Sequence, residues 1–206
     1  VNKFGADVLV REDGSETPAF YASSGMQSVM PMDVMVNYIT DCVGKNASLS
    51  MRERNEISET DNDYAVRRLF YQSAQLFIEE PEQNLYPESQ KLVVMSIVRS
   101  LKKALENGSE QSLALVTTHS PYIMSVMNVL LLAAIVTEKG LRQEVIDGDS
   151  VLPSSSISGY FIDENGIFQN ILDAEVPMLS GNDLDGVSDW VDDSISKLNE
   201  VLFATV

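Results

Sequence analysis

The sequence predicts an α/β fold with a mainly parallel sheet flanked by helices, together with short antiparallel hairpins. Two compact apolar runs, at 75–78 and 113–116, each stop at polar residues, which is typical of buried strands. Apolar residues at helical spacing follow each run, over 88–105 and from Pro121 to about Glu138. This alternation of strand and helix with short connections is the pattern of a parallel sheet covered by helices.

Residues that favour helix ends support both of these helices. Gly108 stands where the first helix should stop, in the manner usual for a C-terminal glycine. Ser120 and Pro121 are typical of the cap and the first turn of the second helix. Because the second helix is apolar nearly all round, we expect it to be buried.

A hairpin and a helix are expected before the first of these strands. Runs that favour β-structure at 6–10 and 17–21 flank Asp13-Gly14, which is a turn signal. Apolar residues then recur at helical spacing over 26–43, with Pro31 inside the pattern, so the helix should begin or kink there. The remaining expectations are a loop with some helix at 45–63, a short helix at 64–72, a hairpin of 157–162 and 167–172, and an amphipathic helix at 183–202.

Composition narrows the class of protein. The 206 residues correspond to about one domain, or one and a half, at roughly 150 residues each. A net charge of −17 argues against a chain that wraps a nucleic-acid backbone, which needs clustered Lys and Arg. One Cys and one His exclude an internal disulfide and the usual zinc clusters. The longest apolar run, 129–136, is shorter than the ~20 residues that span a bilayer, so we expect a soluble, cytoplasmic protein with no membrane segment.

The C-terminal part of the chain carries most of the net negative charge. Residues 143–206 contain 13 acidic residues and one basic residue, a net charge of −12. Such a segment keeps a protein soluble, or it offers a docking surface to a basic partner. Nothing in the sequence selects a particular partner.

Polar side chains follow both predicted strands, at the sheet edge where ligands bind in open α/β folds. Glu79 and Glu80 end the first strand, and Thr118 and His119 follow the second. Nucleotide hydrolysis needs a carboxylate to hold Mg²⁺ through its water shell, a second carboxylate to deprotonate or orient water, and a donor that senses the γ-phosphate. The two acids and the histidine have these chemical types. Taken singly, each is also an ordinary solvated residue at a strand end or turn.

Three motifs together resemble those of ABC-type ATPases, in the variant of AAA-type ATPases related to SMC and OLD-like proteins. The Walker B and D-loop segment of that family is similar to 76–90, where apolar residues precede Glu-Glu-Pro-Glu and Leu-Tyr-Pro follows. The family's switch-histidine loop resembles 118–121, and its signature motif resembles 23–27. The motifs stand in the expected order, and the resemblance covers most of the chain. It implies a partial P-loop NTPase fold.

The resemblance also implies a role for each matching residue. Glu79 would support Mg²⁺ through water, Glu80 would be the general base, and His119 would contact the γ-phosphate. Backbone N–H groups at a helix start suit the approach of an anion. The residues expected near the nucleotide of a second copy are the signature residues Ser23, Ser24 and Gly25, either serine serving as the signature serine, and the D-loop residues Glu82 and Asn84.

The sequence departs from the family pattern at four points. Tyr86 stands where the family usually has His, Ser24 where ABC signatures usually have Gly, and Glu79 where most ABC proteins have Asp. No Gly-x-x-x-x-Gly-Lys-Ser/Thr phosphate loop occurs in the 206 residues. We therefore expect the C-terminal portion of a longer ATPase, which alone binds little or no ATP.

The expected organisation is one partial ATPase domain in three segments. Residues 1–72 would hold the signature and a helical region, 73–140 the Walker B and switch-histidine core, and 141–206 an acidic hairpin and helix. The resemblance implies ATP and Mg²⁺ as cofactors of the full-length protein, an N-terminal lobe with the phosphate loop as partner, and a homodimer. Through the full-length protein it also leaves room for nucleic acid, which the charge of this chain does not favour.

Two other functions fit parts of the sequence. A metal-dependent nuclease could use Glu79, Glu80 and Glu82 as a carboxylate cluster. Adjacent strand residues point to opposite faces, which weakens this reading. A non-catalytic interaction module would instead use the acidic tail, with the motifs serving only the fold.

Overall fold

The computed structural model describes residues 2–3, 6–58, 70–108, 111–173, 178–180 and 194–198. The chain divides into two compact units. The first unit comprises residues 1–118 and 147–151, and the second comprises 119–146 and 152–206. The N-terminal hairpin and all of the candidate residues except His119 belong to the first unit.

A parallel pair of strands forms the centre of the first unit. β4 (Gln75–Glu79) lies beside β5 (Leu113–Thr117), with Leu76 opposite Ala114 and Glu79 opposite Thr117. Helix α4 (Pro87–Asn107) connects the two strands. The predicted order of strand, helix and strand is therefore confirmed.

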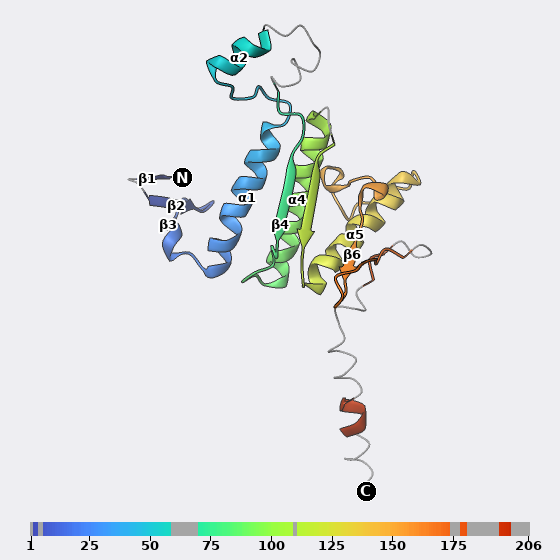
Figure 1. Ribbon diagram of the computed structural model, residues 1–206. Helices are drawn as coiled ribbons and strands as arrows, with labels where there is room; N and C mark the ends of the chain where they lie inside the picture. Colours follow the sequence, from blue (N-terminus) through green and yellow to red (C-terminus); the bar gives the residue numbers. More distant parts are fainter. Residues whose placement is uncertain are drawn as a thin grey trace. The chain divides into compact units, whose positions relative to one another are not determined.

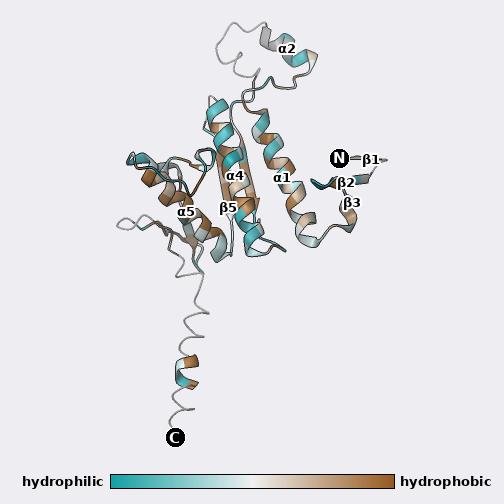
Figure 2. Cartoon of the chain, turned by 180° about the vertical axis from the view of Figure 1, so that it is seen from behind, coloured by the Kyte–Doolittle hydropathy of each residue, from teal (hydrophilic) through white to brown (hydrophobic). Residues whose placement is uncertain are grey.

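Two helices cover one face of this pair. Leu76 and Ile78 of β4 are buried against Val36 of α1 (Ser24–Cys42) and against Val93 and Ile97 of α4. Figure 1 shows α1 and α4 side by side along the strands. Figure 2 shows that β5 is largely hydrophobic, whereas α4 carries hydrophilic and hydrophobic residues. Burial of these aliphatic side chains holds the strands to the helices, at about 1.5–3 kcal/mol for each side chain.

The opposite face of the strands is exposed among the described residues. Phe77 is 73% exposed, and Leu113 and Leu115 are 48% and 47% exposed. The prediction of fully buried strands is therefore wrong for this face. Side chains alternate between the two faces of a strand, and a continuous apolar run cannot tell whether both faces are covered.

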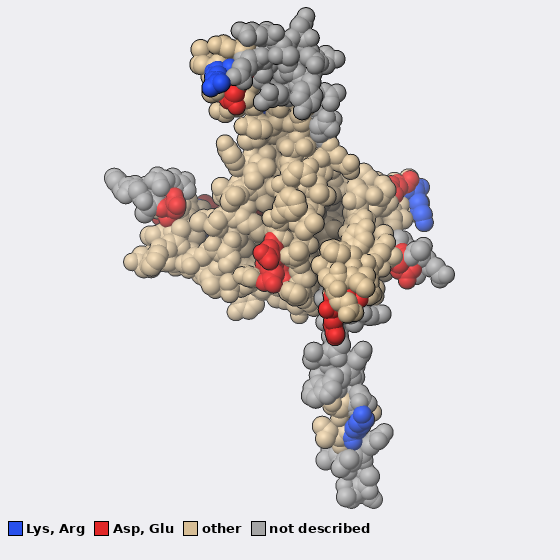
Figure 3. Space-filling model, viewed as in Figure 1, with Lys and Arg blue, Asp and Glu red and all other residues tan. Residues whose placement is uncertain are grey.

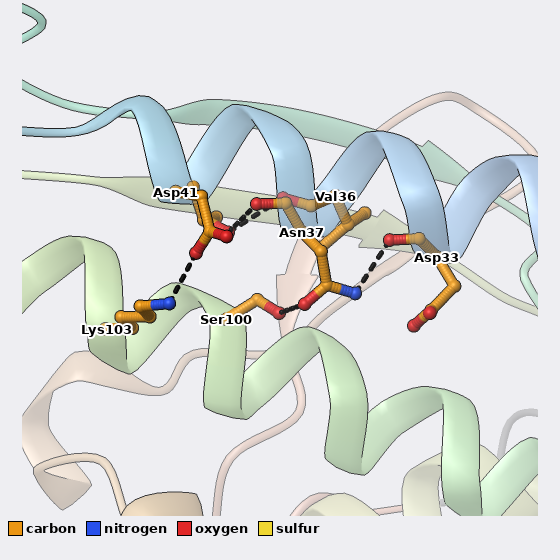
Figure 4. A network of polar contacts seen from close by, with 7 residues as sticks. Asp33, Val36, Asn37, Asp41, Ser100 and Lys103 are labelled. Carbon is orange, nitrogen blue, oxygen red and sulfur yellow. Dashed lines mark hydrogen bonds and ion pairs between the residues drawn. The ribbon is translucent and has the colours of Figure 1, made fainter. Parts of the chain in front are cut away.

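Polar pairs align α1 with α4. The Ser96 hydroxyl donates to Asp33 at 2.5 Å, and the Ser100 hydroxyl donates to Asn37 at 3.0 Å. One turn further along, the Lys103 ammonium contacts the Asp41 carboxylate at 2.5 Å. Figure 4 shows the part of this network around Asn37 and Asp41. Residue numbers rise in the same direction along both helices from one pair to the next, so the two helices run parallel.

Two helix ends differ from expectation. Pro31 lies inside α1, which begins seven residues before it at Ser24. Gly108 does cap α4, but its φ is −87°, so it does not adopt the left-handed conformation common for glycine after a helix. A Cβ on Gly108 would lie 2.5 Å from the carbonyl oxygen of Gln72 and 2.9 Å from that of Ala104. Close approach of backbone, and not a positive φ, therefore requires glycine there.

The N-terminal strands are antiparallel. β1 (Asn2–Lys3) pairs with β2 (Ala6–Val10), which pairs with β3 (Glu16–Pro18). The predicted hairpin is confirmed, but residues 19–21 form a short 3₁₀ helix, η1 (Ala19–Tyr21), in place of strand. Pro18 lacks the N–H that would continue a ladder.

The connection after α1 is partly described. α2 (Met51–Ser58) lies in the segment expected to be a loop with some helix. Most of the helix expected at 64–72 falls outside the described residues. Phe70 forms an isolated bridge with Asn46, and residues 71–72 are not helical, so the predicted helix does not reach its expected end.

The second unit holds α5 (Pro121–Glu138), η3 (Ser154–Ser156), and the hairpin of β6 (Tyr160–Ile162) and β7 (Phe168–Asn170). η2 (Gly148–Ser150) belongs to the first unit. The prediction of the hairpin is confirmed. Of the helix expected at 183–202, residues 194–198 are described and are helical.

Helix α5 is only partly buried. Leu131 is 1% exposed, whereas Tyr122 is 51% exposed, so the expectation of burial all round is wrong for one side. The Ser120 hydroxyl accepts from the N–H of Tyr122 at 3.2 Å and of Ile123 at 3.4 Å, which confirms the predicted cap. Within the described ranges, α5 alone has the length and composition to cross a membrane, a test that core helices of soluble proteins also pass.

Acidic side chains dominate the charged surface. Figure 3 shows those of the described residues on one face as separate small groups. The whole of the acidic stretch 181–193 lies outside the described residues. A docking surface for a basic partner therefore stays a prediction.

Candidate active site

The ends of β4 and β5 are joined at one edge of the parallel pair. Glu79, the last residue of β4, lies opposite Thr117, the last residue of β5. Directly beyond, the N–H of Glu80 donates to the carbonyl oxygen of Thr117 at 2.9 Å. The predicted polar residues thus follow neighbouring strands at the edge where ligands bind in open α/β sheets. We call residues 80–84, which come next, the carboxylate turn.

The backbone of the carboxylate turn is left-handed at two positions. Glu80 has φ +44° and Asn84 has φ +60°, and neither is glycine. Such conformations cost about 1–3 kcal/mol each and persist where surrounding contacts enforce them. Gln83 supplies two contacts, because its N–H donates to the Glu80 carbonyl at 3.1 Å and its side-chain amide to the Glu80 carboxylate at 2.6 Å.

The two adjacent acids differ in exposure. Glu79 is exposed, whereas Glu80 is half-buried and held by Gln83. The Glu79 carboxylate is therefore open to solvent, as a ligand of hydrated Mg²⁺ would need, and the Glu80 carboxylate accepts a hydrogen bond that helps to orient it, which suits a base. The described residues contain no group of three or more His, Cys, Asp or Glu side chains arranged to hold a metal ion directly.

Glu82 points toward its own chain. One carboxylate oxygen accepts a hydrogen bond of 2.7 Å from the hydroxyl of Thr118, and the other oxygen is buried. The family resemblance places this residue between two copies, near nucleotide. Within one copy, the structure gives it a contact with the segment that follows β5, and its place between two copies stays a prediction. Sequence reasoning missed the role of Thr118 because the two residues are 36 positions apart.

Asn84 joins the carboxylate turn to the start of α1. Its side-chain amide donates to the Ser28 hydroxyl at 3.3 Å. Its carbonyl oxygen lies 2.8 Å from the point where a Cβ on Gly25 would stand, and Leu85 lies 3.1 Å from that point. The segments that resemble the signature and the D-loop are therefore in contact within one chain. Ser28 was not among the expected site residues, and no local pattern singles it out.

The two signature serines have different places in α1. Ser23 is the cap residue, and its hydroxyl accepts from the N–H of Met26 at 3.4 Å. Ser24 is the first helical residue, and its carbonyl accepts from the Ser28 hydroxyl at 3.1 Å. Both serines are exposed. The exposed N–H groups of a helix start can bind an anion, which is compatible with the expected phosphate contact.

Gln27 fixes the backbone that leads into the signature segment. Its side-chain amide donates to the carbonyl oxygens of Phe20 at 2.8 Å and of Ala22 at 3.0 Å. These contacts hold the turn of η1, on which Phe20 and Tyr21 are 83% and 76% exposed. Sequence reasoning included Gln27 in the motif but did not foresee this structural role.

His119 is exposed and stands two positions beyond Thr117, as the first residue of the second unit. The buried residue that follows it, Ser120, caps α5. The structure therefore places His119 at the junction between a strand and a capped helix, as the sequence predicts. Its role in sensing phosphate stays a prediction.

Comparison with models of protein families identifies a match. A family model described as AAA ATPase domain matches residues 2–124, which is more than half of the chain. The match includes every candidate residue, from Ser23 to His119. No curated protein and no solved structure matches the chain.

Proposed function

Because the chain belongs to the AAA ATPase domain family, we propose that it is the C-terminal lobe of an ATP-hydrolysing enzyme of the ABC and SMC-like type. In the full-length protein, an N-terminal lobe with the phosphate loop would complete the nucleotide site. Two copies would hold ATP head to tail, with Ser23 to Gly25 of one copy against the γ-phosphate bound by the other. The family supports ATP hydrolysis in general, and the site geometry supports the residue assignments.

The observation that carries this proposal is the carboxylate turn at the shared end of two parallel strands. Glu80 is held by Gln83 and joined through its N–H to Thr117. A fixed carboxylate beside solvent can take a proton from water as that water attacks the γ-phosphorus. The bond between the γ-phosphorus and the bridging oxygen then breaks, and ADP leaves with phosphate as the second product.

The exposed Glu79 fits the second part of the site. A Mg²⁺ ion bound with ATP would neutralise charge on the phosphate oxygens. Glu79 would orient the water shell of that ion, since Mg²⁺ keeps several of its waters in nucleotide sites. His119 would add a donor toward the γ-phosphate.

The test is Glu80→Gln in the natural full-length protein. The amide cannot accept the proton, so we expect turnover to fall by roughly 10²–10⁴-fold while ATP binding is retained. Glu88→Gln is a matched control, because Glu88 is an exposed acid paired with Lys91 on α4. Steady-state ATPase assays measure the turnover of both variants, and nucleotide titration measures their ATP binding. Unchanged turnover in Glu80→Gln would remove this residue from the role of base.

A second test concerns the 206 residues alone. With no phosphate loop in this sequence, we propose that the chain binds ATP weakly or not at all. Isothermal titration of the purified chain with Mg²⁺ and ATP measures this. Micromolar affinity would contradict the proposal that the main phosphate contacts come from another lobe.

A further inference from the structure

We propose that Glu82 is a positioning residue, which fixes the segment after β5 by holding Thr118, the residue directly before His119. The proposal rests on the ATPase function above and deepens it. The resemblance assigns Glu82 to the interface with a second copy, whereas the contacts within the chain connect it to the segment after β5 of its own copy.

The contact that carries the proposal is the short, part-buried hydrogen bond between Thr118 and Glu82. The hydroxyl of Thr118 donates to Oε1 of Glu82 at 2.7 Å, and both side chains are part-buried. Oε2 of the same carboxylate is buried, and so is the preceding Pro81. A hydroxyl bound to a carboxylate at this distance is in the range of strong, charge-assisted hydrogen bonds.

A second contact acts on the neighbouring residue. The N–H of Glu80 donates to the carbonyl oxygen of Thr117 at 2.9 Å. The carboxylate turn therefore holds two consecutive residues of the segment after β5, one through its backbone and one through a side chain. A shift of Glu80 would therefore move the end of β5 with it, and a shift of Thr118 would displace Glu82 in the carboxylate turn.

Hydrogen-bond chemistry favours a carboxylate at position 82 and a hydroxyl at position 118. A carboxylate is only an acceptor, so it accepts from the Thr118 hydroxyl without offering a competing donor. Gln at position 82 would place an amide N–H₂ group on one of the two oxygen positions, of which Oε2 is buried. Val at position 118 keeps the shape of Thr but removes the donor, whereas Ser keeps the donor.

The catalytic consequence follows from positioning. Neither residue is proposed to touch nucleotide, so loss of the contact should leave ATP binding intact. A phosphate-sensing loop that is displaced by about 1 Å can cost up to 10²-fold in rate. We therefore expect an effect on kcat with little change in KM.

The experiment compares Thr118→Val, Thr118→Ser, Glu82→Gln and the double variant Glu82→Gln/Thr118→Val in the natural full-length protein. Thr118→Val and Glu82→Gln should lower kcat by roughly 10- to 100-fold with KM within about twofold of wild type. Thr118→Ser keeps the hydroxyl, so its kcat should stay close to the wild-type value. The double variant should be no slower than the slower single variant, because both remove the same contact. Thr137→Val is the matched control, since it removes a hydroxyl that donates to the Ala133 carbonyl of its own helix.

Amide hydrogen exchange over 117–120 gives a readout that is independent of activity. Exchange there should rise on the order of tenfold in Thr118→Val and in Glu82→Gln, and should stay at the wild-type rate in Thr137→Val. Wild-type turnover in Thr118→Val, a fall in kcat in Thr118→Ser as large as in Thr118→Val, additive effects in the double variant, or unchanged exchange would each overturn the proposal. If the wild-type protein hydrolyses no ATP, the proposed function fails, and hydrogen exchange still decides whether Glu82 fixes this segment.

Discussion

Glycine at position 25 has a structural explanation that differs from the one its motif implies. The family resemblance would explain it by the close approach of a phosphate. In the structure, the space of its missing side chain is occupied by the carbonyl oxygen of Asn84, which is itself in a left-handed conformation. The residue therefore allows close contact between the start of α1 and the carboxylate turn.

Gly25→Ala tests this explanation. The new Cβ would lie 2.8 Å from the Asn84 carbonyl, so backbone must move, and we expect a loss of about 1–3 kcal/mol in the free energy of unfolding. Gly148→Ala is the control, because nothing lies within 4 Å of its Cβ position. Chemical denaturation of both variants measures the difference. Equal stability of the two would show that Gly25 does not need to be glycine for packing.

The sequence could predict residue types at the site, but not their partners. Glu79 and Glu80 were identifiable because a strand end and a family motif coincide there. The contacts of Asn84 with Ser28 and of Glu82 with Thr118 join residues 56 and 36 positions apart. Asn84 and Glu80 both have left-handed φ values. Asn adopts this conformation more readily than most residues, whereas Glu gives no local signal of it.

At the level of elements, the pair of Asp41 and Lys103 links α1 to α4 and makes their packing depend on pH. The Lys103 side chain, through its hydrogen bond first and its charge second, holds the pKa of Asp41 below its ordinary value. In the unfolded chain the partner is absent, and the pKa returns toward about 3.9. The stabilising contribution is therefore present above the unfolded pKa and is lost as pH falls through the lower, folded pKa.

Lys103→Met should raise the pKa of Asp41 toward its ordinary value. It should also reduce stability at neutral pH and have a smaller effect below the folded pKa of Asp41. Carboxyl chemical shifts followed across pH measure the first effect, and denaturation at two pH values the second. Lys91→Met, which breaks a pair with Glu88 within α4, should leave the Asp41 titration unchanged. An identical Asp41 titration in wild type and Lys103→Met would contradict the prediction.

Element prediction succeeded where periodicity and end signals agreed, as for β4, α4, β5 and α5. It failed where burial depends on neighbours from elsewhere in the chain. The exposed Phe77 lies between the buried Leu76 and Ile78, although all three are apolar, because α1 and α4 cover one face only. Likewise, Gly108 was correctly expected at the end of α4, but its close approach to Gln72 is a tertiary contact.

For the whole molecule, the proposed head-to-tail arrangement predicts nucleotide-dependent dimers. If Glu80→Gln blocks hydrolysis without blocking binding, ATP should hold the full-length variant as a dimer, whereas the wild type should return to monomer as ATP is consumed. Light scattering after size-exclusion chromatography, with ATP and with ADP, measures this. Ser23→Arg should prevent the dimer, because a bulky side chain would occupy the exposed start of α1. A monomeric Glu80→Gln variant at saturating ATP would contradict the arrangement.

The return of residues 147–151 to the first unit limits how the protein can be shortened. Ser150 is completely buried, Arg99 donates to its hydroxyl at 2.9 Å, and Lys102 donates to the Gly148 carbonyl at 2.6 Å. A fragment that stops at Thr118 would lack residues 147–151. Arg99 and Lys102 of α4 would then lose the acceptors that these residues provide. Dissecting the protein into halves therefore requires a version in which the loop at 147–151 is retained, for instance by splicing it back after a short linker.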